Sequence, residues 1–364
     1  MKAILKLFAR PLNVLLLFIP IAVAAELLHW PPVAVFVTAA LAVVPLSGIL
    51  GDATEELSVR AGDRVGALIN ATLGNAAELI ITILALREGL FELVRASIVG
   101  SIIGNLLLVA GASLLLGGLK HGTQKFNRND ASMNATLLLV AAVVLAVPSL
   151  FAVAIEPNKA NVQSLSLITA GVIIFLYVLN LVFGFRNNPA ATHHADPGQV
   201  PVTHQPRMKV SVALGLLGVA TVLIALMSEI LVSAVEPMVK QIGISEFFVG
   251  IILVPIIGNV AEHVVAVEVA IKNKMDLAMG IAVGSSLQIA LFVAPLLIFI
   301  SLLFGNVLPL EFNSFELVAL LVTALIMAQV SSDGETNWLE GALLIGLYVI
   351  LGVAFFFLPT GLAH

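Results

Sequence analysis

Two stretches of the sequence, GNAAEL from Gly74 to Leu79 and GNVAEH from Gly258 to His263, decide the fold. Each places a glutamate four residues after a glycine, inside a long apolar run. The whole chain has 60% hydrophobic and only 11% charged residues, with a mean hydropathy of +1.11. These values are typical of an integral membrane protein, in which a repeated acidic motif needs a specific reason.

The two motifs belong to a longer internal repeat. A shift of 184 residues aligns the range 65–116 with 249–300 without a gap. Matches between apolar residues arise easily by chance in such a chain, so the evidence for the repeat comes from the matching polar and glycine positions. These matches are Gly66/Gly250, Gly74/Gly258, Asn75/Asn259, Glu78/Glu262, Gly100/Gly284 and Ser101/Ser285.

Long apolar runs predict an all-α polytopic membrane protein, because about 20 apolar residues suffice for a helix to cross a bilayer. The runs lack the period-two alternation of a membrane β-barrel, which is therefore excluded. We expect eleven transmembrane helices, approximately at 12–29, 33–50, 65–86, 96–118, 132–154, 164–185, 210–232, 247–271, 277–304, 315–331 and 340–358.

The predicted helices group into two repeats of five. Because five is odd, the second repeat enters the membrane from the opposite side, and such inverted repeats are typical of secondary transporters. A polar stretch with four prolines and three histidines separates the repeats and indicates a cytoplasmic linker. The expected organisation is an extra N-terminal helix at 1–31, a first repeat at 32–186, the linker at 187–208 and a second repeat at 209–364.

Basic residues predict the orientation. With a cytoplasmic N-terminus, eleven crossings place 13 of the 17 Lys and Arg residues on the cytoplasmic side and the C-terminus outside. No small-residue cleavage site follows the first apolar segment, so we interpret it as a retained span. A prokaryotic inner membrane is the expected location. The net charge of -5 is too small to indicate a nucleic-acid partner.

Glu78 and Glu262 both fall near the bilayer midplane. A charged group there costs about 2.5 to 3.5 kcal/mol on insertion scales, so each glutamate should face the protein interior and have a partner. The inverted repeat brings the two carboxylates face to face. Two adjacent carboxylates take up protons unless a cation neutralises them, so a divalent cation and protons would compete for the same oxygens. This competition predicts that the site exchanges a divalent cation for protons.

The neighbouring residues favour a hard cation such as calcium, which prefers oxygen ligands. The chain has no cysteine and no paired-histidine motif here, so a soft-metal site is disfavoured and no cofactor is expected. Simple hydrogen bonding between helices is the rival interpretation of the amides and hydroxyls. The expected metal ligands are Glu78, Glu262, Asn75 and Asn259, with backbone carbonyls at Gly74 and Gly258.

Two further groups of polar residues accompany the glutamates. Ser101 and Asn105 are four residues apart on one predicted helix, and Ser285 and Gln288 are three apart on another, so each pair forms a polar stripe along the transport path. His263, next to Glu262, is a candidate for proton exchange, with an interhelical hydrogen bond as the alternative.

The paired glutamate motifs, each followed by a Val-Gly-Ser helix, resemble the signature of calcium/proton antiporters of the cation/proton exchanger (CAX) family, within the calcium/cation antiporter superfamily. The resemblance covers nearly the whole chain. It implies that Glu78 and Glu262 bind calcium and exchange it for protons. Sodium/calcium exchangers of the superfamily tend to carry a further acid on the flanking helices, where this chain has amides. Eukaryotic members often have an acidic linker, but here the linker contains a single acid, Asp196.

The expected function is therefore a secondary active transporter, not an enzyme, that exchanges cytosolic calcium for external protons by alternating access. The alternatives are a sodium-coupled exchanger on the same fold and a cation channel. An intramembrane zinc hydrolase is disfavoured because no second histidine follows Glu262-His263 at helical spacing. The lipid bilayer, calcium and protons are the expected partners, and a homo-oligomer remains open.

Overall fold

The structure, a computed structural model, describes residues 11–154, 159–187 and 208–358. The first half contains η1 (Pro11–Leu17), α2 (Phe18–Leu27), α3 (Pro32–Leu73), α4 (Ala76–Arg87), α5 (Phe91–Ile103), η2 (Gly104–Val109), α6 (Ala110–His121), β1 (Gln124–Lys125), α7 (Arg128–Ala154) and α8 (Lys159–Asn187). The second half contains α9 (Val210–Ile242), α10 (Glu246–Phe248), η4 (Val249–Leu253), α11 (Val254–Ile271), α12 (Met275–Gln288), η5 (Ile289–Val293), α13 (Ala294–Ser301), η6 (Leu302–Phe304), α14 (Ser314–Val330), β2 (Glu335–Thr336) and α15 (Trp338–Phe356).

The predicted all-α polytopic architecture is confirmed. Within the described residues, eight helices are long and apolar enough to cross a membrane, and two shorter apolar helices lie at Pro11–Leu27 and Ser314–Val330. The predicted helix at 65–86 is divided between the end of α3 and α4. The number of eleven crossings stays a prediction, as do the two repeat boundaries. The predicted linker lies outside the described residues except for its end residues, Asn187 and Met208.

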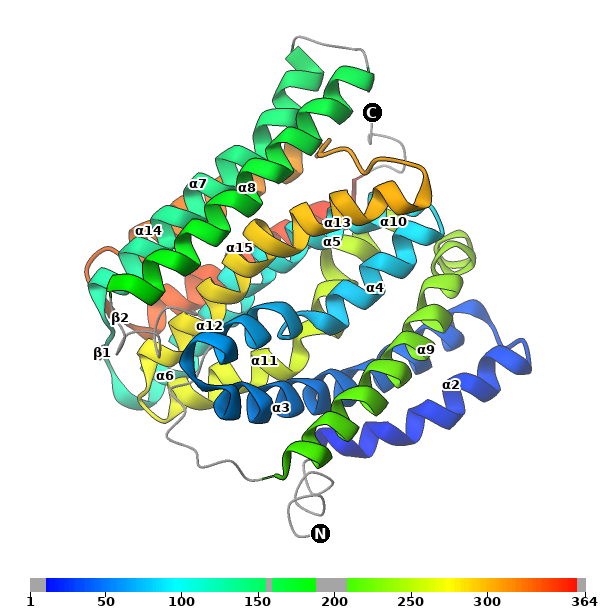
Figure 1. Ribbon diagram of the computed structural model, residues 1–364, viewed down its shortest axis with the longest axis horizontal. Coiled ribbons are helices and arrows are strands. Elements are labelled where there is room, and N and C mark those ends of the chain that lie inside the picture. Colours follow the sequence, from blue (N-terminus) through cyan, green and yellow to red (C-terminus); the bar gives the residue numbers. More distant parts are fainter. Residues whose placement is uncertain (1–10, 155–158, 188–207, 359–364) are drawn as a thin grey trace.

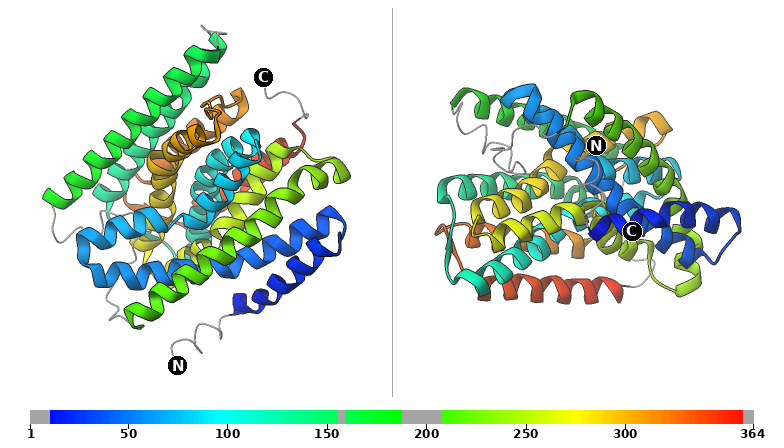
Figure 2. Two further views of the ribbon diagram at one scale, coloured as in Figure 1. Left: turned by 45° about the vertical axis from the view of Figure 1, so that its right-hand side comes forward. Right: turned by 90° about the horizontal axis from the view of Figure 1, so that it is seen from below.

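The helices form a layered bundle with the motif helices at its centre. Figure 1 shows the α7–α8 hairpin along one edge and α2 with α9 along the opposite edge, while α4, α5, α11 and α12 lie between them. In the view from below, α15 (red) runs along one face (Figure 2). A two-residue antiparallel pairing of β1 with β2 joins the α6–α7 connection of the first half to the α14–α15 connection of the second.

α3 turns sharply at Gly62, which separates a long apolar helix from a short segment at 63–73 that leads to the first glutamate motif. Gly62 has φ 79° and ψ 171°. This region of backbone space is open essentially to glycine alone, since a Cβ atom would clash with the backbone. The turn therefore depends on the absence of a side chain at this position.

Gly62→Ala is expected to lower the free energy of unfolding by roughly 1–3 kcal/mol, because alanine strains the backbone at this φ and ψ. Gly51→Ala is the matched control, since Gly51 lies on the same helix and nothing is within 4 Å of the added Cβ at either glycine. Alanine in a regular helix is neutral or slightly stabilising. The measurement is the Tm of each purified variant in detergent. Equal Tm values for the two variants would contradict a backbone requirement at Gly62.

The two repeats pack differently at equivalent positions. Val249 is fully buried at 0% exposure, whereas its repeat equivalent Val65 is 55% exposed. In the second half, a Cβ added at Gly250 would lie 2.6 Å from the Leu93 carbonyl oxygen, so η4 packs closely against α5. Leu68, on the segment that is equivalent to η4, is also exposed. Equivalent segments of the two repeats are thus packed unequally.

Candidate ion-binding site

The two repeated glutamates meet in the centre of the bundle. Glu78 lies in the first turn of α4, and Glu262 lies in the middle of α11. The two carboxylates are close enough to interact electrostatically. A Cβ added at Gly258 would lie 3.6 Å from the Glu78 Cβ, so the small residue of one motif allows the glutamate of the other to approach. The structure therefore places one motif of each repeat against the other.

The Glu78 carboxylate is buried and held by its own half of the chain. Its Oε1 accepts a hydrogen bond from the Ser101 hydroxyl on α5. Its position in the first turn of α4 puts the negative charge at the positive end of the helix dipole. Desolvation is costly for a buried carboxylate, so this hydroxyl and the helix N-terminus partly replace the water that folding removes.

The Glu262 carboxylate is bound in the equivalent way by the second half and is less buried than Glu78. Ser285 on α12 directs its hydroxyl towards Glu262 Oε2 at 2.9 Å and Asn75 Oδ1 at 3.3 Å. A hydroxyl has one hydrogen to donate, so these two acceptors share it. This contact links the second glutamate to the asparagine of the first motif.

A second contact between the halves is made by Gln288 at the end of α12. Its Oε1 accepts a hydrogen bond of 2.7 Å from Asn75 Nδ2, and both side chains are buried. Its repeat-equivalent position in the first half is Gly104, which has no side chain to reach Asn259. The polar network is consequently asymmetric: Asn75 is held on both sides of its amide, whereas the Nδ2 of Asn259 has no hydrogen-bond partner among the described residues.

Several buried polar atoms at this centre lack a hydrogen-bond partner within the described part of the chain. They include Glu78 Oε2, Asn259 Nδ2 and Asn105 Nδ2. Buried polar atoms without partners are rare and costly, so each needs an explanation. The Asn259 side chain lies close enough to interact with the Glu78 carboxylate, but Glu78 Oε2 has no hydrogen-bond partner among the described residues. A buried carboxylate oxygen that has no hydrogen-bond partner among the described residues is suited to accept a proton or a cation.

The backbone around the first motif differs from the sequence expectation. The helix that carries the first motif is interrupted at Gly74 and Asn75, so Glu78 lies at a helix start and not in mid-helix. By contrast, α11 continues unbroken through Gly258. His263 follows Glu262 directly on α11, and adjacent helical residues do not share a face.

Ser97 was missed by the sequence reasoning. It lies on α5 four residues before Ser101, is buried, and has a hydroxyl without a hydrogen-bond partner among the described residues. The signal was present in the sequence, since Ser97, Ser101 and Asn105 repeat at intervals of four and therefore share one helical face. The polar stripe on this helix is longer than expected.

Gln288→Leu is expected to lower the free energy of unfolding by about 1–3 kcal/mol, because it leaves the buried Asn75 amide without its acceptor. Gln329→Leu on the exposed face of α14 is a matched control that should change the Tm little. Thermal unfolding of both variants in detergent checks this. A Gln288→Leu protein as stable as the control would show that the Asn75 contact contributes nothing to the packing of the two halves.

The donors at this centre are carboxylate, amide and hydroxyl oxygens, which are the ligands that hard cations prefer. Within the described residues, no group of three or more His, Asp or Glu side chains could hold a metal ion. The two glutamates are accompanied by neutral amide and hydroxyl groups from Asn75, Ser285 and Ser101. When a divalent cation leaves such a set, the two carboxylates keep two negative charges, which protons can neutralise.

Comparison with known proteins identifies the family of the chain. The sodium/calcium exchanger protein family matches residues 31–186 and 212–357. A Ca²⁺/H⁺ antiporter of Aphanothece halophytica is 44% identical over 95% of this chain and 96% of its own length. The Ca²⁺/H⁺ antiporter ChaA of Bacillus subtilis is 43% identical over 93% of this chain and 97% of its own length.

A solved structure shows the same fold. The structure of native YfkE superimposes with a TM-score of 0.83 at 42% sequence identity, covering 95% of this chain and 100% of the other. The chain is therefore a multi-pass integral membrane protein of a transporter class. The resemblance that the two glutamate motifs indicated is confirmed, and the chain belongs to the sodium/calcium exchanger protein family.

Proposed function

We propose that this protein is a calcium/proton antiporter that binds calcium between Glu78 and Glu262. The observation that carries the proposal is the meeting of these two carboxylates, one from each repeat, in a buried cluster of oxygen ligands. The names of the relatives that are 43–44% identical support the choice of ions. Calcium and protons are both substrates, and the proposal includes no cofactor and no catalytic step.

The exchange follows from competition for the same oxygens. Calcium binds when both glutamates are ionised, with the oxygens of Asn75 and Asn259 and nearby backbone carbonyls at Gly74 as further ligands. Protons displace calcium by neutralising the carboxylates. Ser101, Asn105, Ser285 and Gln288 line the path on the flanking helices. His263, directly after Glu262 on α11, is a further candidate for proton exchange.

Alternating access provides the transport step. The unequal packing of Val65 and Val249 supports it, because equivalent segments that differ in packing are expected when the site opens to one side at a time. By the orientation that the basic residues predict, the N-terminus is cytoplasmic, the C-terminus is outside, and calcium leaves the cytosol as protons enter. A prokaryotic inner membrane remains the proposed location.

The energetics are adequate for calcium extrusion. One pH unit supplies about 1.4 kcal/mol for each proton that moves down its gradient. If two protons return for each calcium ion, the cycle is electroneutral, and one pH unit sustains roughly a hundredfold calcium gradient. A third proton would make the exchange depend on membrane voltage.

Proteoliposomes with an imposed pH gradient test the proposal directly. We expect calcium uptake to be accompanied by proton movement in the opposite direction, followed with a calcium indicator and a pH dye in the same vesicles. A sodium gradient at constant pH should not drive uptake. Uptake that follows sodium and not pH would replace the proposal with the sodium-coupled exchanger, and calcium flux without any counter-ion would indicate a channel.

A further inference from the structure

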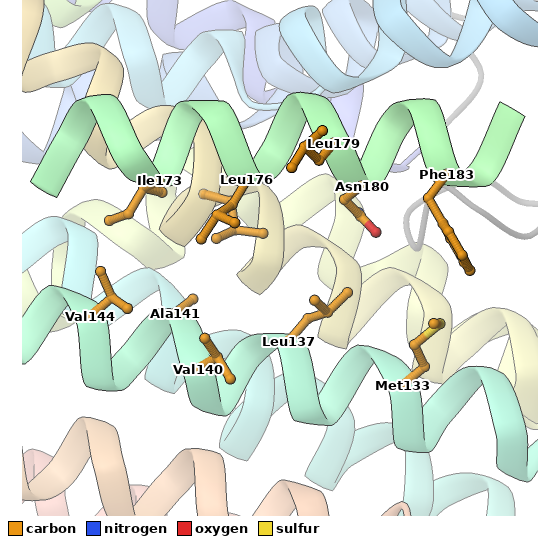
Figure 3. Close-up of a pocket in the computed structure, with 11 residues that line it drawn as sticks. Met133, Leu137, Val140, Ala141, Val144, Ile173, Leu176, Leu179, Asn180 and Phe183 are labelled. Carbon is orange, nitrogen blue, oxygen red and sulfur yellow. The ribbon is translucent and has the colours of Figure 1, made fainter. Parts of the chain in front are cut away.

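A groove of about 320 Å³ lies between α7 and α8, on the edge of the molecule away from α9. Five lining residues come from α7, five from α8, and Leu291 comes from η5. Figure 3 shows the α7 and α8 side chains facing each other across this space. The walls are apolar apart from one side chain, Asn180. The groove is therefore shaped for a hydrocarbon ligand with one polar group.

The groove opens outwards within the apolar parts of both helices. Val140 on α7 and Leu176, Leu179 and Phe183 on α8 are exposed while they line it. Both helices are among those long enough to cross the membrane. In a membrane-spanning helix, an exposed apolar face at this position meets lipid hydrocarbon and not water. The immediate neighbours of the groove are therefore lipid chains.

Asn180 points into the space between the two helices (Figure 3) and makes no hydrogen bond in the described structure. An amide in hydrocarbon without a partner is costly. The internal repeat does not require an amide at this position, because aligning Tyr177 with Tyr348 places Leu351 at the equivalent position in the second half. The amide therefore needs a partner that is not part of the protein.

The depth of Asn180 identifies the chemistry of that partner. α8 has 29 residues and ends at Asn187, so at 1.5 Å per residue it is about 43 Å long, and Asn180 lies about 10 Å from its C-terminal end. The hydrocarbon core is about 30 Å thick, so a centred helix of this length extends about 6 to 7 Å beyond it on each side. Asn180 then lies just inside the core boundary. The ester carbonyls of glycerophospholipids lie at this level.

We propose that the groove binds one acyl chain of a glycerophospholipid from the leaflet at the C-terminal end of α8, with Asn180 Nδ2 donating a hydrogen bond to the ester carbonyl. The chain lies along Val140, Leu176 and Leu179. Its inner side contacts Leu291, which follows the site residue Gln288 by three positions. Beside the groove, Tyr177 packs on Phe292 with ring centroids 5.6 Å apart. The bound chain therefore forms part of the packing around η5.

Lipid retention tests whether the groove is occupied. Purified protein in detergent is incubated with a diacyl phosphatidylcholine, washed, and analysed by native mass spectrometry for lipid bound per chain. We expect wild type to retain one lipid, and Val140→Phe, which fills the groove, to lose it. Val143→Phe is the matched control, because Val143 lies on the same helix, is 49% exposed against 48% for Val140, and does not line the groove.

An ester/ether comparison tests the hydrogen bond. The diether analogue has the same chains but no carbonyl, so wild type should retain it about threefold to tenfold less than the diester, the size expected for one hydrogen bond. Asn180→Leu, which introduces the residue of the second repeat, should remove this preference while keeping the groove apolar. The Tm of each variant is measured as well. We expect all variants to have the Tm of wild type, which would show that the changes in lipid retention do not come from unfolding.

Three outcomes would overturn the proposal. Equal retention by wild type and Val140→Phe would show that the lipid binds elsewhere. Equal retention of diester and diether by wild type would remove the role of Asn180. A dimer in light scattering that Val140→Phe dissociates would show that a second copy of the chain, and not a lipid, covers the groove. None of these readouts involves transport, so they are independent of the proposed exchange.

Discussion

Replacing either Glu78 or Glu262 with glutamine is expected to reduce coupled calcium/proton exchange at least about 100-fold, which corresponds to about 2.7 kcal/mol of lost interaction. Glutamine keeps the size of the side chain but carries no charge and releases no proton. The variant site keeps one carboxylate, so it neutralises only half the charge of a divalent cation and can return at most one proton. Both losses act on the same step, so the effect should exceed that of any other single substitution proposed for this protein.

The glutamine variants should still fold, because the Ser101 and Ser285 hydroxyls can donate to an amide oxygen as they do to the carboxylates. The control is Glu236→Gln, which removes an exposed acid that pairs with Lys240 at 3.1 Å. Surface ion pairs contribute little, so this variant should exchange calcium normally. Calcium uptake and internal pH are measured together in proteoliposomes. Coupled exchange in either site variant at the level of the control would show that the two repeated glutamates are not the binding site.

Gly100→Ala is expected to have the second largest effect, a loss of roughly 1–3 kcal/mol in the free energy of unfolding together with most of the exchange activity. A Cβ at Gly100 would overlap the carbonyl of Ile251 in η4. The obstacle is backbone and not the end of a flexible side chain, so α5 and η4 would have to separate. This separation would disturb the contact between the repeats next to Ser101.

Gly104→Ala provides the matched control, because Gly104 lies four residues further along, directly after α5, and nothing is within 4 Å of an added Cβ there. Alanine costs no more than glycine in a helical segment, so this variant should keep its Tm and its exchange rate. The measurements are the Tm in detergent and calcium uptake in proteoliposomes. If Gly100→Ala behaved like Gly104→Ala, the close approach of α5 and η4 would be unimportant for stability and for transport.

Composition and periodicity were enough to predict the membrane class and the positions of the helices, because both depend on apolar residues that follow one another along the chain. The internal repeat was equally visible, since the shift of 184 residues needs no coordinates. The repeat also made it possible to expect Glu78 and Glu262 in one site. The structure brings the two carboxylates close enough to interact.

Local backbone choices were harder to predict. The two motifs share Gly-Asn-x-Ala-Glu, yet the helix is interrupted at Gly74 and continues through Gly258. The same residues take different conformations because their surroundings differ: the segment before Gly74 follows the turn at Gly62, whereas the segment before Gly258 is packed against α5. Packing free energy outweighs the small local preference of glycine.

The membrane class, the helices, the repeat and the two repeated glutamates could thus be recognised without coordinates, because each of these is a pattern along one chain. Only the tertiary structure decided that Gln288 holds Asn75 of the opposite half, that Glu78 keeps an open buried oxygen, and that Asn180 faces a groove. These features arise between residues that are distant in sequence. Their geometry depends on how helices pack, and no periodicity within one helix records it.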